Sequence, residues 1–116
     1  MRARQLSFGL LLVAAPGSME CVRAEATPSD QPIPLTIGNH RFEPFEIRIS
    51  ANKRVMITII NDDTTPEEFD STALKVEKVV PGKSKGTIRI GPLKPSRYPF
   101  IGEFNEATAK GVVIAE

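Results

Sequence analysis

The stretch that decides the fold is YPFIGEFNEATAKGVVIAE, residues 98–116, at the end of the chain. Three aromatic residues mark a strand in its first part, a short polar loop follows, and residues 112–114 (VVI) predict a second strand that closes the chain. The loop between the two strands carries Glu103, Asn105 and Glu106. Such an arrangement indicates a site at one end of a β-sandwich.

The segments upstream are short and apolar, and turns rich in proline, glycine and asparagine separate them. Residues 35–37 are predicted as an edge strand, and residues 45–49 alternate with period two, as in a half-buried strand. Residues 55–60 are almost entirely apolar, which indicates a central strand covered on both faces. Residues 74–80 are strand-like but change phase, and residues 87–90 alternate again. About seven such strands predict an all-β sandwich.

Residues 1–24 have the pattern of a signal peptide. A basic start precedes LSFGLLLVAA (6–15), which is too short to span a bilayer, and Val22-Arg23-Ala24 offers a cleavage site before Glu25. A retained anchor and a lipoprotein linked through Cys21 are the alternatives, and the shortness of the apolar run speaks against the anchor. We expect an exported, periplasmic protein that does not insert into the membrane after cleavage.

The exported part is predicted as a leader and one domain. Residues 25–34 are proline-rich and polar, as in a flexible leader, and residues 35–116 form the domain. Cleavage would remove Cys21, the one cysteine, so neither a disulfide nor a thiolate ligand is expected in the domain. His40 is the single histidine, and a hydrolytic triad would depend on it alone.

Charge argues against nucleic acid as a partner. Residues 1–24 contain three arginines and one glutamate, so their removal lowers the formal net charge from +1 to −1. The rest of the chain has no block of basic residues, which nucleic-acid binding would require.

Carboxylates beside loops are the remaining candidates for chemistry. Glu67 and Glu68 follow Pro66 directly, and alternation places Glu103 on the side of the last strand opposite Phe104. A carboxylate on an apolar strand is costly unless a cation or a hydrogen-bond donor meets it. A metal site is one interpretation, and a solvated acidic rim is the other. The core is predicted to include the phenylalanines Phe42, Phe45, Phe69, Phe100 and Phe104.

Three segments together resemble a cupredoxin domain. They are ITIINDDTTPEEF (57–69), PGKSKGTIRIGPLKPSRYPFIGEF (81–104) and GVVIAE (111–116). The resemblance covers about residues 35–116 and implies a cupredoxin-like Greek-key β-sandwich.

In cupredoxins these segments hold copper through two histidines, a cysteine and a methionine. The resemblance places Glu67 at the first histidine, Gly102 at the cysteine, Asn105 at the second histidine and Ala109 near the methionine. A type 1 copper centre requires thiolate and imidazole ligands, so none is expected here.

More narrowly, the chain is similar to the periplasmic cupredoxin-like proteins of bacterial ferrous iron uptake, the FtrB and EfeO types. This similarity implies an acidic metal site made of Glu67 or Glu68, Glu77 and Glu103. Many relatives have histidine at the position of Asn105, whose amide is a poorer ligand. His40 is a possible further ligand, and a turn histidine bonded to the local backbone is the alternative. Carboxylates shift the preference of a site towards iron, manganese or copper(II).

The similarity implies an exported protein that assists ferrous iron uptake. It would bind an iron or copper ion and support Fe(II) oxidation before transfer, together with a ferrous iron permease and a companion periplasmic iron-binding protein. Oxidation would require a second redox partner, so the chain is not expected to be an enzyme by itself. The alternative is a metal-free sandwich in the periplasm that acts as an interaction or scaffold module, with carboxylates that dock a basic partner.

Overall fold

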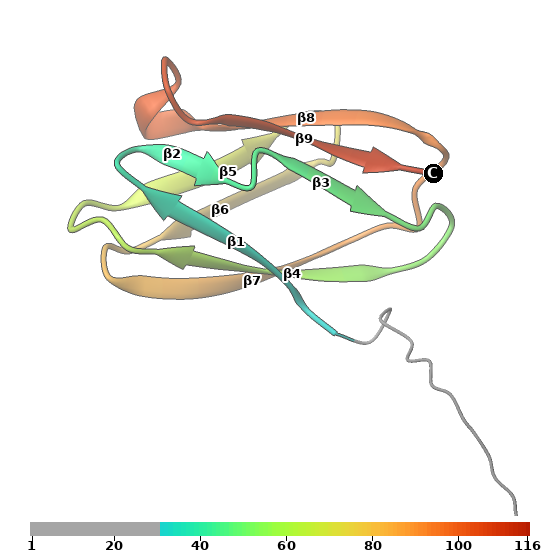
Figure 1. The fold of residues 1–116 in the computed structure, drawn as a ribbon, viewed down its shortest axis with the longest axis horizontal. Coiled ribbons are helices and arrows are strands. Elements are labelled where there is room, and N and C mark those ends of the chain that lie inside the picture. The colour runs from blue at the N-terminus through green and yellow to red at the C-terminus, as the bar shows by residue number, and fades with distance from the viewer. Residues whose placement is uncertain (1–30) are drawn as a thin grey trace, which may run out of the picture.

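Two β-sheets packed face to face make up the part of the chain that the computed structural model describes, residues 31–116 (Figure 1). The predicted signal peptide and most of the leader lie outside these residues. The elements are β1 (Ile33–Gly38), β2 (Arg41–Glu43), β3 (Glu46–Ile49), β4 (Val55–Asn61), β5 (Glu67–Ser71), β6 (Val76–Val80), β7 (Ser84–Ile90), β8 (Ser96–Gly102), the 3₁₀ helix η2 (Glu103–Asn105) and β9 (Lys110–Ala115).

The strands form one sheet of four and one sheet of five. Their orders are β2-β1-β4-β7 and β3-β9-β8-β5-β6, with β1 parallel to β4 and β3 parallel to β9. Nine strands stand where about seven were predicted, and the two that were not predicted are β2, which follows the turn after β1, and β5, which follows the loop after β4. The prediction of an edge strand at residues 35–37 is wrong, because the chain turns back after β1 and β2 pairs with its outer side.

The core lies between the sheets and follows the period of two. Along β4, Val55, Ile57 and Ile59 are buried, while Met56, Thr58 and Ile60 are only half-buried on the other face. The prediction that both faces of this strand are covered is therefore wrong. The sandwich has two layers, and no other element of residues 31–116 packs over the outer face of β4.

Three phenylalanines form the aromatic part of the core. The ring centroid of Phe42 lies 5.0 Å from that of Phe100 and 6.1 Å from that of Phe69, edge to face, and Phe69 and Phe100 stack at 4.8 Å. Phe45 and Phe104, also predicted as core, are 64% and 51% exposed, so that prediction is wrong for both. Phe104 lies beyond the end of β8 in η2, and Phe45 precedes β3, so strand alternation does not apply to either residue.

Four connections meet at one end of the sandwich, on the left in Figure 1. We call this the loop end; it comprises residues 39–40, 62–66, 81–83 and 103–109. Buried Asn61 ties two of the connections together, because its amide nitrogen donates to the carbonyl oxygens of Thr65 at 2.9 Å and Val80 at 3.1 Å. The same end holds the residues singled out for chemistry.

Candidate functional site

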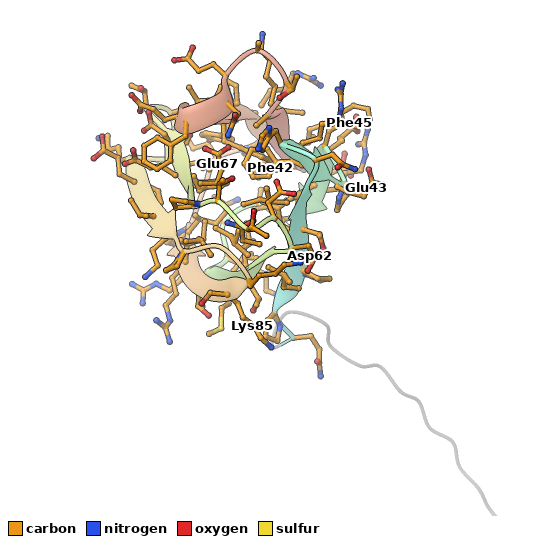
Figure 2. All side chains as sticks on the ribbon, turned by 90° about the vertical axis from the view of Figure 1, so that its left-hand side faces the viewer. Phe42, Glu43, Phe45, Asp62, Glu67 and Lys85 are labelled. Carbon is orange, nitrogen blue, oxygen red and sulfur yellow. The ribbon has the colours of Figure 1, made fainter. Side chains whose placement is uncertain are left out.

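Glu67 lies inside the protein at the loop end. Figure 2, which faces this end, shows it between the two sheets. Alternation along β5 directs Glu67, Phe69 and Ser71 inward, and only 1% of Glu67 is exposed. The solvated-rim interpretation is therefore wrong for this residue, whose carboxylate is part of the interior.

Both oxygens of this buried carboxylate accept hydrogen bonds. Oε1 accepts from the backbone N–H of Phe104 at 2.8 Å and from that of Glu68 at 2.9 Å. Oε2 accepts from the side-chain amide of Asn105 at 2.7 Å. Three donors compensate the water that the carboxylate lost on burial. They also join the start of β5 to η2, which begins 36 residues later in the chain.

Gly102 and Ala109 complete this cluster. A Cβ atom on Gly102 would lie 2.7 Å from Cδ of Glu67 and 2.7 Å from Cβ of Ala109, so the close approach requires glycine. The backbone N–H of Gly102 donates to the carbonyl of Ala109 at 2.9 Å, and Ala109 is fully buried. The resemblance places four residues at copper-ligand positions, and these four lie together in the structure: Glu67, Gly102, Asn105 and Ala109.

These four residues do not provide the ligands of a type 1 copper ion. They offer one carboxylate and one amide, whereas that centre requires a thiolate and imidazoles. Within residues 31–116, no three side chains of His, Cys, Asp or Glu come together in a way that could hold a metal ion. That the protein forms no type 1 centre stays a prediction.

The other acidic candidates lie outside the sandwich. Glu68 faces outward from β5, and Glu103 is exposed at the start of η2. A hydrogen bond with the Asp70 carboxyl raises the pKa of Glu103 above its ordinary value, and the charge of Asp70, slight desolvation and the charges of Glu68 and Glu106 act in the same direction. We call Glu68, Asp70, Glu103 and Glu106 the acidic corner.

Asp70 was missed as a site residue. Its place beside Glu103 depends on the pairing of Asp70 with Ile101 between β5 and β8, and no local pattern gives that register. Glu77 is exposed in β6, directly opposite Asp70 on the side away from β8. The structure therefore brings Glu103 together with Glu68 and Asp70, and it does not bring Glu77 to Glu67.

His40 stands in a tight turn between β1 and β2. Asn39 and His40 both have positive φ, 53° and 59°, as in a type I′ turn. The Asp63 carboxylate accepts from the N–H of Asn39 at 2.8 Å and from that of His40 at 2.9 Å. The His40 carbonyl accepts from the hydroxyl of Thr108 at 2.6 Å, so this turn is tied to two other connections of the loop end.

The His40 imidazole makes one hydrogen-bond contact among the described residues, between Nε2 and Oγ1 of Thr65 at 3.5 Å. Asp63 was also missed, although Asp in a loop of Asn, Asp and Thr commonly bonds nearby backbone. The hydrogen bond from the His40 backbone is the largest of the effects that lower the pKa of Asp63; the bond from Asn39 and the charges of His40 and Lys83 add to it, and desolvation opposes it.

Comparison with known proteins places the fold. The model of the family "Cupredoxin-like domain" matches residues 7–115. An uncharacterized protein of Rickettsia prowazekii (strain Madrid E) is 35% identical over 82 residues, which cover 71% of this chain and 66%, just under two thirds, of that protein. Within residues 31–116 there is no helix with the length and apolar character needed to cross a membrane.

Solved structures share the fold at low sequence identity. Auracyanin A, a "blue" copper protein from Chloroflexus aurantiacus, superposes with a TM-score of 0.63 at 12% identity and covers 74% of this chain and 98% of its own. Amicyanin from Paracoccus versutus gives 0.59 at 14% identity, over 78% and 85% of the two chains. A chain of a heme-copper terminal oxidase dimer gives 0.64 at 15% identity, over 89% and 78%. The predicted all-β, cupredoxin-like fold is confirmed.

Proposed function

This chain belongs to the family of cupredoxin-like domains, whose members often bind copper, and we propose that it is an exported protein that binds metal ions during ferrous iron uptake. The observation that supports this function is the acidic corner. There Asp70 lies close enough to Glu103 to raise the pKa of its carboxyl, first through a hydrogen bond and then through its charge.

Two neighbouring carboxyl groups are a natural place for a cation. A hydrogen bond with Asp70 and, after it, the charge of Asp70 raise the pKa of Glu103, so a divalent ion bound between the two carboxylates would relieve their repulsion. Carboxylate oxygens are hard ligands and favour iron or manganese over copper(I). Glu68 and Glu106 add negative charge around the pair without closing a cage.

An exposed site with two carboxylates leaves the rest of the coordination to water. Ions held in this way exchange readily, as Mg²⁺ does when one or two carboxylates and several waters hold it. We therefore treat the ion as cargo that the protein passes on, with iron as the first choice and copper(II) as the second. The proposed recipients are a ferrous iron permease and a companion iron-binding protein in the periplasm.

Oxygen ligands also bear on the redox state of the cargo. Carboxylates stabilise Fe(III) more than Fe(II), so bound Fe(II) would lose an electron more easily than the free ion. The electron must go to a separate redox partner. The proposed role in oxidation is thus assistance and not catalysis by this chain alone.

The test is a calorimetric titration of the exported protein, purified from periplasm, with Fe(II) under anaerobic conditions, Mn(II) and Cu(II). Glu103→Gln and Asp70→Asn each remove one carboxylate of the pair, and we expect each to weaken Fe(II) binding about tenfold or more, equivalent to about 1.4 kcal/mol. Glu43→Gln removes an exposed carboxylate on β2 and should leave the affinity unchanged. Equal affinities in all four proteins, or no binding of any of the ions, would refute the proposal.

A second candidate is the metal-free interaction module. Phe104 and Val79 are about half exposed, 51% and 50%. They adjoin the acidic corner, because Phe104 follows Glu103 and Val79 pairs with Glu68 across β5 and β6. Exposed apolar side chains beside carboxylates would suit a partner with a basic surface. Phe104→Ser should then weaken binding to that partner, while Phe45→Ser, the matched control elsewhere on the surface, should not.

A further inference from the structure

We infer that the Glu67 carboxylate closes the position where blue copper relatives hold their ion and takes over the ion's structural task. A metal at this position links the strand that carries the first ligand to the loop that carries the others. Glu67 makes the same link through hydrogen bonds. The inference concerns how this chain folds, and it stands whether or not the acidic corner binds iron.

Hydrogen bonds engage both carboxylate oxygens of Glu67. The three donors to Glu67 come from the backbone of Glu68 and Phe104 and from the side chain of Asn105, at 2.7 to 2.9 Å. Since a carboxylate only accepts, the Asn105 amide must direct its nitrogen, and not its oxygen, towards Glu67. A metal ion bound by Glu67 would have to displace at least one of these donors.

Glu67 and Ala109 leave no room for a side chain at Gly102. Any side chain there would start at a Cβ 2.7 Å from Cδ and 2.9 Å from Oε2 of Glu67. The Glu67 carboxyl therefore fills the volume into which a cysteine side chain would project. Ala109, fully buried and equally close to that Cβ position, limits the space from the other side.

Glu67 forms no ion pair with a side chain of residues 31–116. The ion pairs of the described residues lie far along the sandwich, where Arg48 meets Glu46 and Glu116. Glu67 thus depends on N–H donors alone, and each donor left without its acceptor would itself be a buried, unsatisfied polar group. Loss of the carboxylate should release η2 and the loop behind it.

The experiment compares variants of the full exported protein in EDTA. Glu67→Leu keeps the volume and removes every acceptor, so we expect the unfolding midpoint to fall by about 10 °C or more. Glu67→Gln keeps one oxygen for the two backbone donors, and its NH₂ group can donate to Asn105 once that amide rotates, so the fall should be much smaller. Glu68→Gln, the adjacent outward carboxylate, should have no effect.

A local readout separates this role from general damage. The backbone amide hydrogen of Phe104, protected by Glu67 in the wild type, should exchange with solvent at least about tenfold faster in Glu67→Leu and at the wild-type rate in Glu68→Gln. In Glu67→Gln and Asn105→Ala, which weaken the cluster but keep an acceptor for this N–H, it should exchange faster by a smaller but measurable factor. If Glu67→Leu does not fold, these two milder variants decide the question by the same measurement.

Two results would overturn the inference. One is an unchanged midpoint and unchanged exchange at Phe104 when Glu67 is replaced. The other is a Glu67→Gln variant with wild-type stability that no longer binds metal, which would make Glu67 a ligand. Failure of the iron proposal has a different signature, because it would appear in Glu103→Gln and Asp70→Asn.

Discussion

Asp63 holds the His40 turn in a conformation that its residues would otherwise avoid. Non-glycine residues at positive φ cost up to about 1–2 kcal/mol each, less for asparagine, and Asn39 and His40 are two consecutive residues of this kind. The two oxygens of Asp63 accept from both backbone N–H groups, at 2.8 and 2.9 Å. We therefore predict that Asp63→Ala destabilises the protein more than the replacement of any exposed loop carboxylate by alanine.

The size of the effect follows from the two lost bonds. A hydrogen bond contributes about 1 kcal/mol to stability, somewhat more when one partner is charged, so Asp63→Ala should lower the free energy of unfolding by about 2 kcal/mol. Asp62→Ala is the matched control, since Asp62 is the exposed neighbour in the same loop. His40→Gly in the Asp63→Ala background should restore about 1 kcal/mol, because glycine tolerates positive φ.

The pH dependence has a definite sign. The folded-state pKa of Asp63 is lowered, so the ionised group stabilises the protein above its unfolded-state pKa, near the ordinary value of 3.8. That contribution is lost as the pH falls through the lower folded-state pKa. Urea unfolding between about pH 2 and 7 measures it. If Asp63→Ala matches Asp62→Ala throughout, or retains the wild-type loss of stability in acid, the proposed clamp is wrong.

Three further predictions concern the loop end. Gly102→Ala forces a Cβ against Glu67 and Ala109 and should cost about 1–3 kcal/mol in urea unfolding, whereas Gly38→Ala, whose Cβ meets nothing within 4 Å, should be tolerated. Asp70→Asn should lower the pKa of Glu103 in an NMR titration. The raised pKa means that the native protein keeps a proton at a pH where the unfolded chain releases it, so the wild type loses stability as the pH rises through the pKa of Glu103, and Asp70→Asn should lose less. The fourfold variant E67H/G102C/N105H/A109M should take up copper(II) with the intense blue colour of a type 1 centre, and Gly102→Cys alone should remain colourless.

The sequence was most informative where strands follow a period of two. Phe69 and Phe100 are buried as expected, because each stands on the inward phase of its strand. Alternation would also have predicted that Glu67 points inward, because it lies two residues from Phe69 on the same strand. Pro66, directly before it, favoured the interpretation of Glu67 as a loop residue. Phe104 shows the opposite case, since the chain leaves the strand at Gly102 and enters one turn of 3₁₀ helix.

The site depended on contacts that no local pattern contains. Asp63 reaches Asn39 and His40 across 24 and 23 residues, and Glu67 reaches Asn105 across 38. Each contact depends on the pairing of two strands that are distant in sequence but adjacent in one sheet, β1 with β4 for Asp63 and β5 with β8 for Glu67. The resemblance to cupredoxins implied that arrangement, so it grouped four residues that do lie together: Glu67, Gly102, Asn105 and Ala109. The hydrogen bonds that these residues form in place of metal ligation could be identified only from the structure.

If both proposals hold, Glu67 and the acidic corner divide between them two tasks that a single metal centre usually combines. In a domain whose metal organises the fold, the free energy of metal binding is also folding free energy, so release of the ion loosens the structure. Here Glu67 holds η2 by hydrogen bonds inside the sandwich, and Glu103 with Asp70 faces solvent on the other side of the same short helix. An ion could therefore come and go at the acidic corner without unfolding the loop that carries Glu103. A protein that passes iron to a permease requires this property, whereas a protein that keeps its ion as a resident electron carrier does not.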